Sequence, residues 1–167
     1  MSSFFSWDLV WEFFPKILSA LPVTLLIVGI ATLVGLVLGS FIAFIRVEKI
    51  PILNQLAAVF VSFIRGTPIL VQLYIVYYGV PSLLQAIQID VSSWDKINFI
   101  YITYGLNTAA FQSETIRAAI LSVPTTQKEA SIACGLTKSQ MYLRVILPQV
   151  GVVALPSFGT TTGALVS

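Results

Sequence analysis

The sequence predicts an all-α protein, a polytopic bundle of transmembrane helices with about four membrane spans in 167 residues. Hydrophobic residues make up 57% of the chain and charged residues only 10%, whereas about a quarter of the residues of a soluble domain are charged. The mean hydropathy is +0.93. Several uncharged runs approach or exceed the length that crosses the roughly 30 Å hydrocarbon core of a bilayer. We therefore expect one small helical membrane domain.

The composition also excludes several kinds of site. The chain has no histidine and Cys134 is its single cysteine, so neither a disulfide framework nor a histidine/cysteine metal site is available. We assign no metal ligand and no catalytic residue. A net charge of +2 is too small to indicate a nucleic-acid partner. No secretory signal is evident, because the first residues lack a basic segment and the apolar run after them is too long.

Residues 1–16 are predicted to form an external N-terminal segment. Trp7, Val10, Trp11 and Phe14 share one face of a helix, which would lie in the membrane interface. A frayed terminus with scattered aromatic residues is the alternative.

The first span is predicted between Lys16 and Arg46. The 29 uncharged residues 17–45 would extend about 43 Å as a helix, which is enough to cross the bilayer. Small residues recur at every fourth position and allow close approach of another helix, either inside this chain, as we favour, or across a homodimer seam. These residues are Ala31, Gly35, Gly39 and Ala43.

A second, broken segment is predicted from Ile50 to about Val80, interrupted at residues 66–68 and followed by an external loop from Pro81 to Lys96. Arg65 precedes the break. A charge at the membrane centre costs about 2.5–3.5 kcal/mol, so we place Arg65 near the cytoplasmic end. It is either a snorkelling anchor or a gating residue.

The third span, Ile97 to Ser113, carries many polar residues for a membrane helix. Such groups need partners in hydrocarbon, so this helix should face other helices or a water-filled path. Hydrogen bonds between helices explain the pattern as well as substrate contact does. The candidate path or gating residues in and beside these spans are Arg65, Gln72, Asn107, Thr108 and Glu114.

Glu114 and Arg117 lie three residues apart at the predicted end of the third span, where they can pair on one face. This pair is more typical of a structural contact than of catalysis. A fourth segment begins at Gln149, and its glycine, proline and threonine content is typical of an irregular helix that lines a path.

Residues 122–148 form the one long polar insertion in the chain. Thr126 precedes Glu129 by three residues, and Thr137 precedes Gln140 by three, the spacing of a capping box at a helix start. Gly135 lies between them, where a helix can end in the left-handed conformation. The pattern predicts a short helix, a glycine corner and a second helix that stops near Pro148.

The basic residues fix an orientation. With the polar loop inside the cell, seven cations are cytoplasmic and only Lys16 and Lys96 are external. The N-terminus is then external. The seven predicted cytoplasmic residues are Arg46, Lys49, Arg65, Arg117, Lys128, Lys138 and Arg144.

This loop resembles the cytoplasmic coupling loop of binding-protein-dependent ABC transporter permeases, the EAA loop. Its mild departures from that pattern are Ser131, Val145 and Thr126. Residues 63–81 resemble a segment typical of the polar amino-acid uptake branch of the family. The resemblance implies ATPase-coupling roles for Gln127, Glu129, Ala130, Ser131, Gly135, Leu147 and Pro148.

The resemblance implies that residues 17–167 are an incomplete type I ABC transmembrane domain, since an intact relative has five spans. We therefore expect a chain truncated at its C-terminus. The resemblance implies that such a chain is the permease subunit of an ATP-driven importer that moves a polar amino acid across the bacterial cytoplasmic (inner) membrane.

The implied partners are a cytoplasmic ABC ATPase, a second permease that is identical or paralogous, an external solute-binding protein and membrane lipid. The sequence contains no phosphate-binding loop, so this chain would bind no cofactor and is not itself an enzyme. ATP and Mg would be used by the partner ATPase.

Three other interpretations remain open. An ion-coupled carrier or channel would bind solute on the third helix without an ATPase, but it should carry an ion-coordinating residue at mid-membrane, and only Glu114 comes near. An assembly subunit would leave the capped loop without a partner. A truncated permease could also be a non-functional fragment.

Overall fold

The computed structural model describes residues 7–86, 88 and 94–164, and within these ranges every regular element is a helix. Two short stretches, η1 and η2, have the wider π-helical turn. The elements are α1 Trp7–Val47, α2 Leu53–Gly66, α3 Ile69–Tyr74, η1 Ile75–Gly79, α4 Val80–Ala86, α5 Lys96–Ser122, α6 Thr125–Ala133, α7 Lys138–Met141, η2 Tyr142–Ile146 and α8 Leu147–Ala164.

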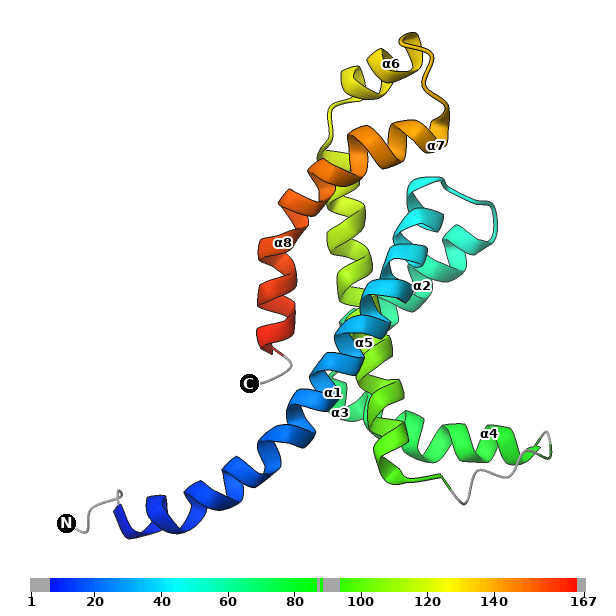
Figure 1. Ribbon diagram of the computed structural model, residues 1–167. Coiled ribbons are helices and arrows are strands. Elements are labelled where there is room, and N and C mark those ends of the chain that lie inside the picture. Colours follow the sequence, from blue (N-terminus) through cyan, green and yellow to red (C-terminus); the bar gives the residue numbers. More distant parts are fainter. Residues whose placement is uncertain (1–6, 87, 89–93, 165–167) are drawn as a thin grey trace.

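Helix α1 packs most extensively against α5, and the two helices cross near the middle of the molecule (Figure 1). The predicted strip of small residues forms this contact. A Cβ atom added to Gly35 would lie 2.5 Å from Thr108 Cγ2, and one added to Gly39 would lie 3.0 Å from the Ala109 carbonyl oxygen. Ala31 is fully buried. The strip is therefore an internal packing surface, as we favoured over a homodimer seam.

Helix α5 is the buried centre of the bundle. It contacts α1, α2, α3, η1 and α8 and buries twelve of its residues, Thr103, Asn107, Thr108, Gln112 and Ser113 among them. Its polar residues thus face other helices, as predicted. The helix has 27 residues, so the predicted end at Ser113 is wrong, and Glu114 and Arg117 lie within it.

Three helical stretches of the described chain are long and apolar enough to cross a membrane: Val10–Val47, Ile69–Ala86 and Lys138–Thr161. Three of the four predicted spans correspond to these stretches. The remaining one corresponds to helix α5, which has 27 residues but is more polar.

The N-terminal part of the chain continues into the first span without a break. Helix α1 runs from Trp7 through Pro15 and Pro22 to Val47. The aromatic side chains of Trp11 and Phe14 are exposed. Residues 1–6 lie outside the described residues, and the interfacial position of residues 1–16 stays a prediction.

The predicted break in the second segment is confirmed. Helix α2 ends at Gly66, Thr67 is extended, and Pro68 caps the next helix, α3. A proline disfavours helical geometry in the residue before it, so the chain turns at Thr67.

Two prolines that were expected to end helices do not. The helix continues past Pro81 to Ala86, so the predicted external loop from Pro81 to Lys96 is wrong at its start. The helix likewise continues past Pro148 to Ala164. The prediction of an irregular helix from Gln149 is therefore wrong, because α8 is a regular α-helix. A proline inside a helix lacks an N–H and clashes with the carbonyl four residues earlier.

In both cases a π-helical turn ends two residues before the proline: η1 ends at Gly79 and η2 at Ile146. The wider turn spans the residues whose carbonyls a proline ring would meet, and at η2 the Leu147 amide donates to the Tyr142 carbonyl five residues back. The helices therefore pass these prolines with a local widening and no break.

The polar loop and the α1–α2 turn lie at one end of the molecule, and the described start of α1 lies at the other (Figure 1). An apolar core beside the loop joins α1, α5, α7, η2 and α8, and includes Ala43, Ile116, Ile120, Met141 and Ile146. This core fixes α7 and η2 against the spans.

Candidate functional site

The polar loop is a compact bend built around Gly135, whose φ of +78° is the predicted left-handed conformation. The Leu136 amide donates to the Ser131 carbonyl at 3.1 Å, and the Gly135 amide donates to the Ile132 carbonyl at 2.9 Å. These two bonds form a Schellman motif, which satisfies the last carbonyls of α6. The corner is thus hydrogen-bonded and fixed.

One of the two predicted capping boxes is present. The Thr137 hydroxyl accepts from the Gln140 amide and the Gln140 side chain accepts from the Thr137 amide, so α7 begins as predicted. The Thr126–Glu129 box is wrong. Pro124 is the N-cap residue of α6, which places Thr126 inside the first turn.

The Thr126–Glu129 capping box is absent because of the backbone conformation just before α6. Val123 is extended, as a residue before proline prefers, and the new helix starts directly after Pro124.

Six of the seven predicted coupling residues are exposed on this loop and the start of α8. They are Gln127, Glu129, Ala130, Gly135, Leu147 and Pro148. Ser131 is buried and its hydroxyl donates to the Gln127 carbonyl at 2.7 Å. The large apolar side chains of Ile132 and Leu143 are 62% and 66% exposed. The loop therefore presents a mixed polar and apolar surface that its own fold does not cover.

Side-chain hydrogen bonds at two places hold the loop to the rest of the molecule. The Gln149 amide nitrogen donates to Gln127 Oε1 at 2.6 Å and joins α6 to α8. Glu48, one residue beyond α1, accepts from Lys138 Nζ and, at 2.6 Å, from the Tyr142 hydroxyl. The Lys138 and Tyr142 hydrogen bonds, in that order, hold the pKa of the Glu48 carboxyl below its ordinary value.

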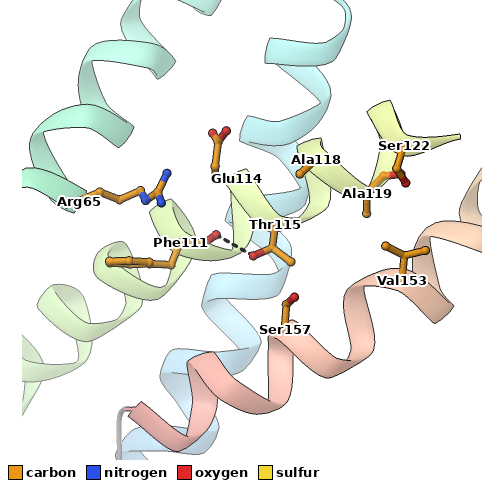
Figure 2. Close-up of a pocket in the computed structure, with 9 residues that line it drawn as sticks. All are labelled: Arg65, Phe111, Glu114, Thr115, Ala118, Ala119, Ser122, Val153 and Ser157. Atoms are coloured by element: carbon orange, nitrogen blue, oxygen red, sulfur yellow. Dashed lines mark hydrogen bonds between the residues drawn. The ribbon is translucent and has the colours of Figure 1, made fainter.

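A cleft of about 460 Å³ lies between α2, α5 and α8, at the loop-proximal half of α5. Figure 2 shows Arg65 at the end of α2 beside Phe111, with Val153 and Ser157 facing the cleft from α8. The guanidinium of Arg65 lies 5.4 Å from the centre of the Phe111 ring, a cation–π contact. Within the described ranges Arg65 forms no ion pair, so its charge is open to the cleft.

Glu114 also lines this cleft, but both of its carboxylate oxygens are occupied. Arg46 of α1 donates to Oε2, and Arg117 Nε donates to Oε1 at 3.0 Å. The predicted Glu114–Arg117 pair is confirmed, and Arg46 extends it between helices. Such a cluster ties α1 to α5 and leaves one positive charge in excess.

Gln72, Asn107 and Thr108 do not line the cleft. The Gln72 amide nitrogen donates to the carbonyls of Ile64, at 2.7 Å, and Thr67, at 2.9 Å, which the break after α2 leaves free. Asn107 of α5 donates to Gln72 Oε1 at 3.0 Å. Gln72 and Asn107 therefore hold the broken segment against α5.

Glu48 is the residue that sequence reasoning missed. Its partners Lys138 and Tyr142 are 90 and 94 residues away in the chain, and nothing in the local pattern of charges after the first span indicated them. Among the residues that the structure describes, no group of three histidine, cysteine or acidic residues is suited to a metal ion.

Comparison with known proteins gives consistent matches. Residues 35–167 match the family described as binding-protein-dependent transport system inner membrane component. The L-cystine transport system permease protein TcyL of Bacillus subtilis (strain 168) is 46% identical over 159 residues, covering 95% of this chain and 66% of the relative. The probable amino-acid permease protein YxeN of the same organism is 39% identical over 155 residues, covering 93% and 67%.

Among solved structures, the chain is similar to one described as the crystal structure of an amino acid ABC transporter with histidines. The TM-score is 0.80 and the sequence identity is 28%, over 97% of this chain and 72% of that one. The chain thus spans about two thirds of the length of the curated relatives that it matches.

Proposed function

The chain belongs to the family of binding-protein-dependent transport system inner membrane components, and on that premise we propose that it is the membrane-spanning permease subunit of an ATP-driven importer of a polar amino acid. The observation that carries the proposal is the polar loop. Its two short helices, fixed by the Gly135 corner and the Thr137 cap, project beyond the spans with Ile132 and Leu143 uncovered.

A fixed loop between membrane helices is suited to transmit force. A separate cytoplasmic ATPase subunit would bind ATP and Mg, hydrolyse the ATP and dock on this loop. Its movement would then reach α5 and α8, which continue directly from the two ends of the loop, and would switch the spans between inward- and outward-facing states.

The chain is a multi-pass membrane protein. We place it in the bacterial cytoplasmic (inner) membrane with an external N-terminus and a cytoplasmic loop, because this orientation puts most basic residues inside. A second permease, identical or paralogous, and an external solute-binding protein complete the proposed assembly, and membrane lipid covers the exposed apolar faces of α1 and α8.

The cleft beside Arg65 is the candidate solute site. Its volume of about 460 Å³ falls in the range of small-molecule sites, and the free guanidinium suits the carboxylate that every amino acid carries. L-cystine is the first solute to test, because a relative with 46% identity is an L-cystine transport permease.

The proposal is tested by purifying the chain in detergent through a tag at its N-terminus and identifying the proteins that accompany it. The native chain should bring down an ATPase with a phosphate-binding loop, and Gly135→Pro or Glu129→Lys should reduce its recovery at least tenfold. Gly151→Ala serves as the control, because an added Cβ there meets nothing within 4 Å. A well-inserted native chain that recovers no ATPase would contradict the proposal and favour a carrier.

A further inference from the structure

Glu48 connects the polar loop to the one long helix that has no direct chain connection to it. The loop runs into α5 at one end and into α8 at the other, whereas α1 is separated from it by α2 to α5. At the cytoplasmic end of α1, Glu48 accepts hydrogen bonds from Lys138 at the start of α7 and from Tyr142 at the start of η2. Its side chain is only 18% exposed.

An aromatic contact supports the same junction. The ring of Phe44, one turn before Glu48, meets the ring of Tyr142 edge to face with centroids 6.0 Å apart. Tyr142 therefore holds α1 both through its hydroxyl and through its ring, so the junction has apolar as well as charged contacts.

The contacts of Glu48 lie on the loop side of η2, and this position determines how a movement of the loop would reach α1 and α8. The π-helical turn Tyr142–Ile146 separates α7 from α8, and π-helical turns are frequent at functional sites and are among the places where helices kink. Both partners of Glu48, Lys138 and Tyr142, lie at or before the first residue of this turn. A movement of the loop can therefore bend at η2 before it reaches α8, while the Glu48 contacts pass it to α1.

From α1 the path continues into the bundle. Arg46, two residues before Glu48, donates to Glu114 of α5, which in turn binds Arg117. Earlier on α1, Gly39 packs directly against the backbone of α5, with no room for a side chain. A displacement of the end of α1 must therefore displace α5 at the cleft that Glu114 lines.

We propose that Glu48 is a positioning residue for energy coupling, which makes α1 follow the loop when the ATPase moves it. This inference rests on the proposed function. It concerns how the movement is distributed, and the docking of the ATPase on the loop does not require it.

The test measures a distance in the transporter assembled with its ATPase in liposomes. Spin labels are placed, in a Cys134→Ser background, on Ser139→Cys, an exposed position of α7 outside the proposed coupling residues, and on Phe41→Cys, an exposed position of α1. In the native background the distance should stay constant between the nucleotide-free and ATP-trapped states. In Glu48→Gln it should shift or broaden by several ångströms, because the ion pair with Lys138 is lost and only the weaker amide hydrogen bond and the apolar contacts of α1 are left to make it follow the loop.

Transport is the second readout. With an equimolar mixture of radiolabelled amino acids that includes cystine, Glu48→Gln should lower the solute imported per ATP hydrolysed at least fivefold while the ATPase still co-purifies. Glu12→Gln removes an acid whose partner Lys16 is 3.3 Å away near the opposite end of α1, and should leave both readouts unchanged.

A distance that stays constant in Glu48→Gln, with import per ATP within twofold of native, overturns the inference and leaves the proposed function intact. If Glu48→Gln fails to assemble, a double variant with the charges exchanged, Glu48→Lys with Lys138→Glu, is compared with Lys138→Glu alone. Better assembly and import in the double variant support the Glu48–Lys138 contact, and no improvement over the single variant overturns the inference. A native chain without an ATPase overturns the proposed function and this inference together.

Discussion

At Gly39 the two central helices come closest to backbone contact. A Cβ atom there would lie 3.0 Å from the carbonyl oxygen of Ala109 and 3.1 Å from the amide nitrogen of Ser113. Backbone atoms of a helix cannot move aside as the end of a flexible side chain can. The close approach of α1 and α5 therefore depends on the absence of a side chain at this position.

Gly39→Ala should destabilise the protein by about 1–3 kcal/mol, because overpacking forces α1 and α5 apart. Gly29→Ala on the same helix is the matched control, since an added Cβ there meets nothing within 4 Å and alanine favours a helix. Thermal unfolding in detergent should show a lower midpoint for Gly39→Ala and an equal or higher one for Gly29→Ala. Equal midpoints for the two variants would refute the packing.

At the scale of elements, Gln72 stabilises the break that Pro68 introduces between α2 and α3. Gln72 is 4% exposed and donates to two carbonyls that the end of α2 leaves without helical partners. It also accepts from Asn107 of α5. The side-chain amide of Gln72 in α3 thus binds the end of α2 and, through Asn107, also holds the turn between α2 and α3 against the central helix α5.

Gln72→Leu should cost about 1–3 kcal/mol for the buried Ile64 carbonyl left without a partner, less for the part-buried Thr67 carbonyl, and should loosen the turn between α2 and α3. The unfolding midpoint and the hydrogen exchange of the amides near Ile64 and Thr67 both report this. Gln55→Leu, at an exposed position of α2, controls for the loss of an amide and should change neither. Identical exchange in the two variants would show that Gln72 does not hold the turn between α2 and α3.

Local sequence rules predicted some elements and failed at others for identifiable reasons. The break at Gly66–Pro68, the corner at Gly135 and the cap at Thr137 depend on residues within a few positions of each other, so the sequence contains the whole cause. Pro81 and Pro148 were expected to end helices. The preceding π-helical turns accommodate them, and composition does not reveal such a turn.

At the scale of the whole molecule, the contacts that define the site join residues far apart in the chain. Arg46 meets Glu114 across 68 residues and Glu48 meets Lys138 across 90. Sequence reasoning identified Glu114 and Arg65 as candidates from their charge in or beside a span, and the structure brings both to one cleft. It could not assign Glu114 its second arginine or Glu48 any partner, because packing determines these pairs.

The proposed orientation predicts which side of the membrane reaches Cys134. This exposed loop cysteine should react with a membrane-impermeant thiol reagent in inside-out vesicles stripped of peripheral proteins, and should be protected in intact cells. Trp94→Cys in a Cys134→Ser background gives the reverse control, since Trp94 is 42% exposed beside the start of α5, at the opposite end of that helix from the loop. Reaction of Cys134 from outside would invert the topology.

The π-helical turn between α7 and α8 also keeps the buried side chains before and after it on the same face of the helix. Four buried residues, Met141, Ile146, Val150 and Ala154, contribute to one core at intervals of five, four and four. In a regular helix an interval of five residues rotates the side chain by about 140° from its starting direction, which would point Met141 and Ile146 to different faces. The π-helical turn absorbs the additional residue. A single apolar stripe therefore runs unbroken from the loop into the span. The number of residues between Lys138 and Leu147 determines the direction in which the side chains of α8 point. One further residue inserted there would rotate the helix beyond it by about 100° about its axis.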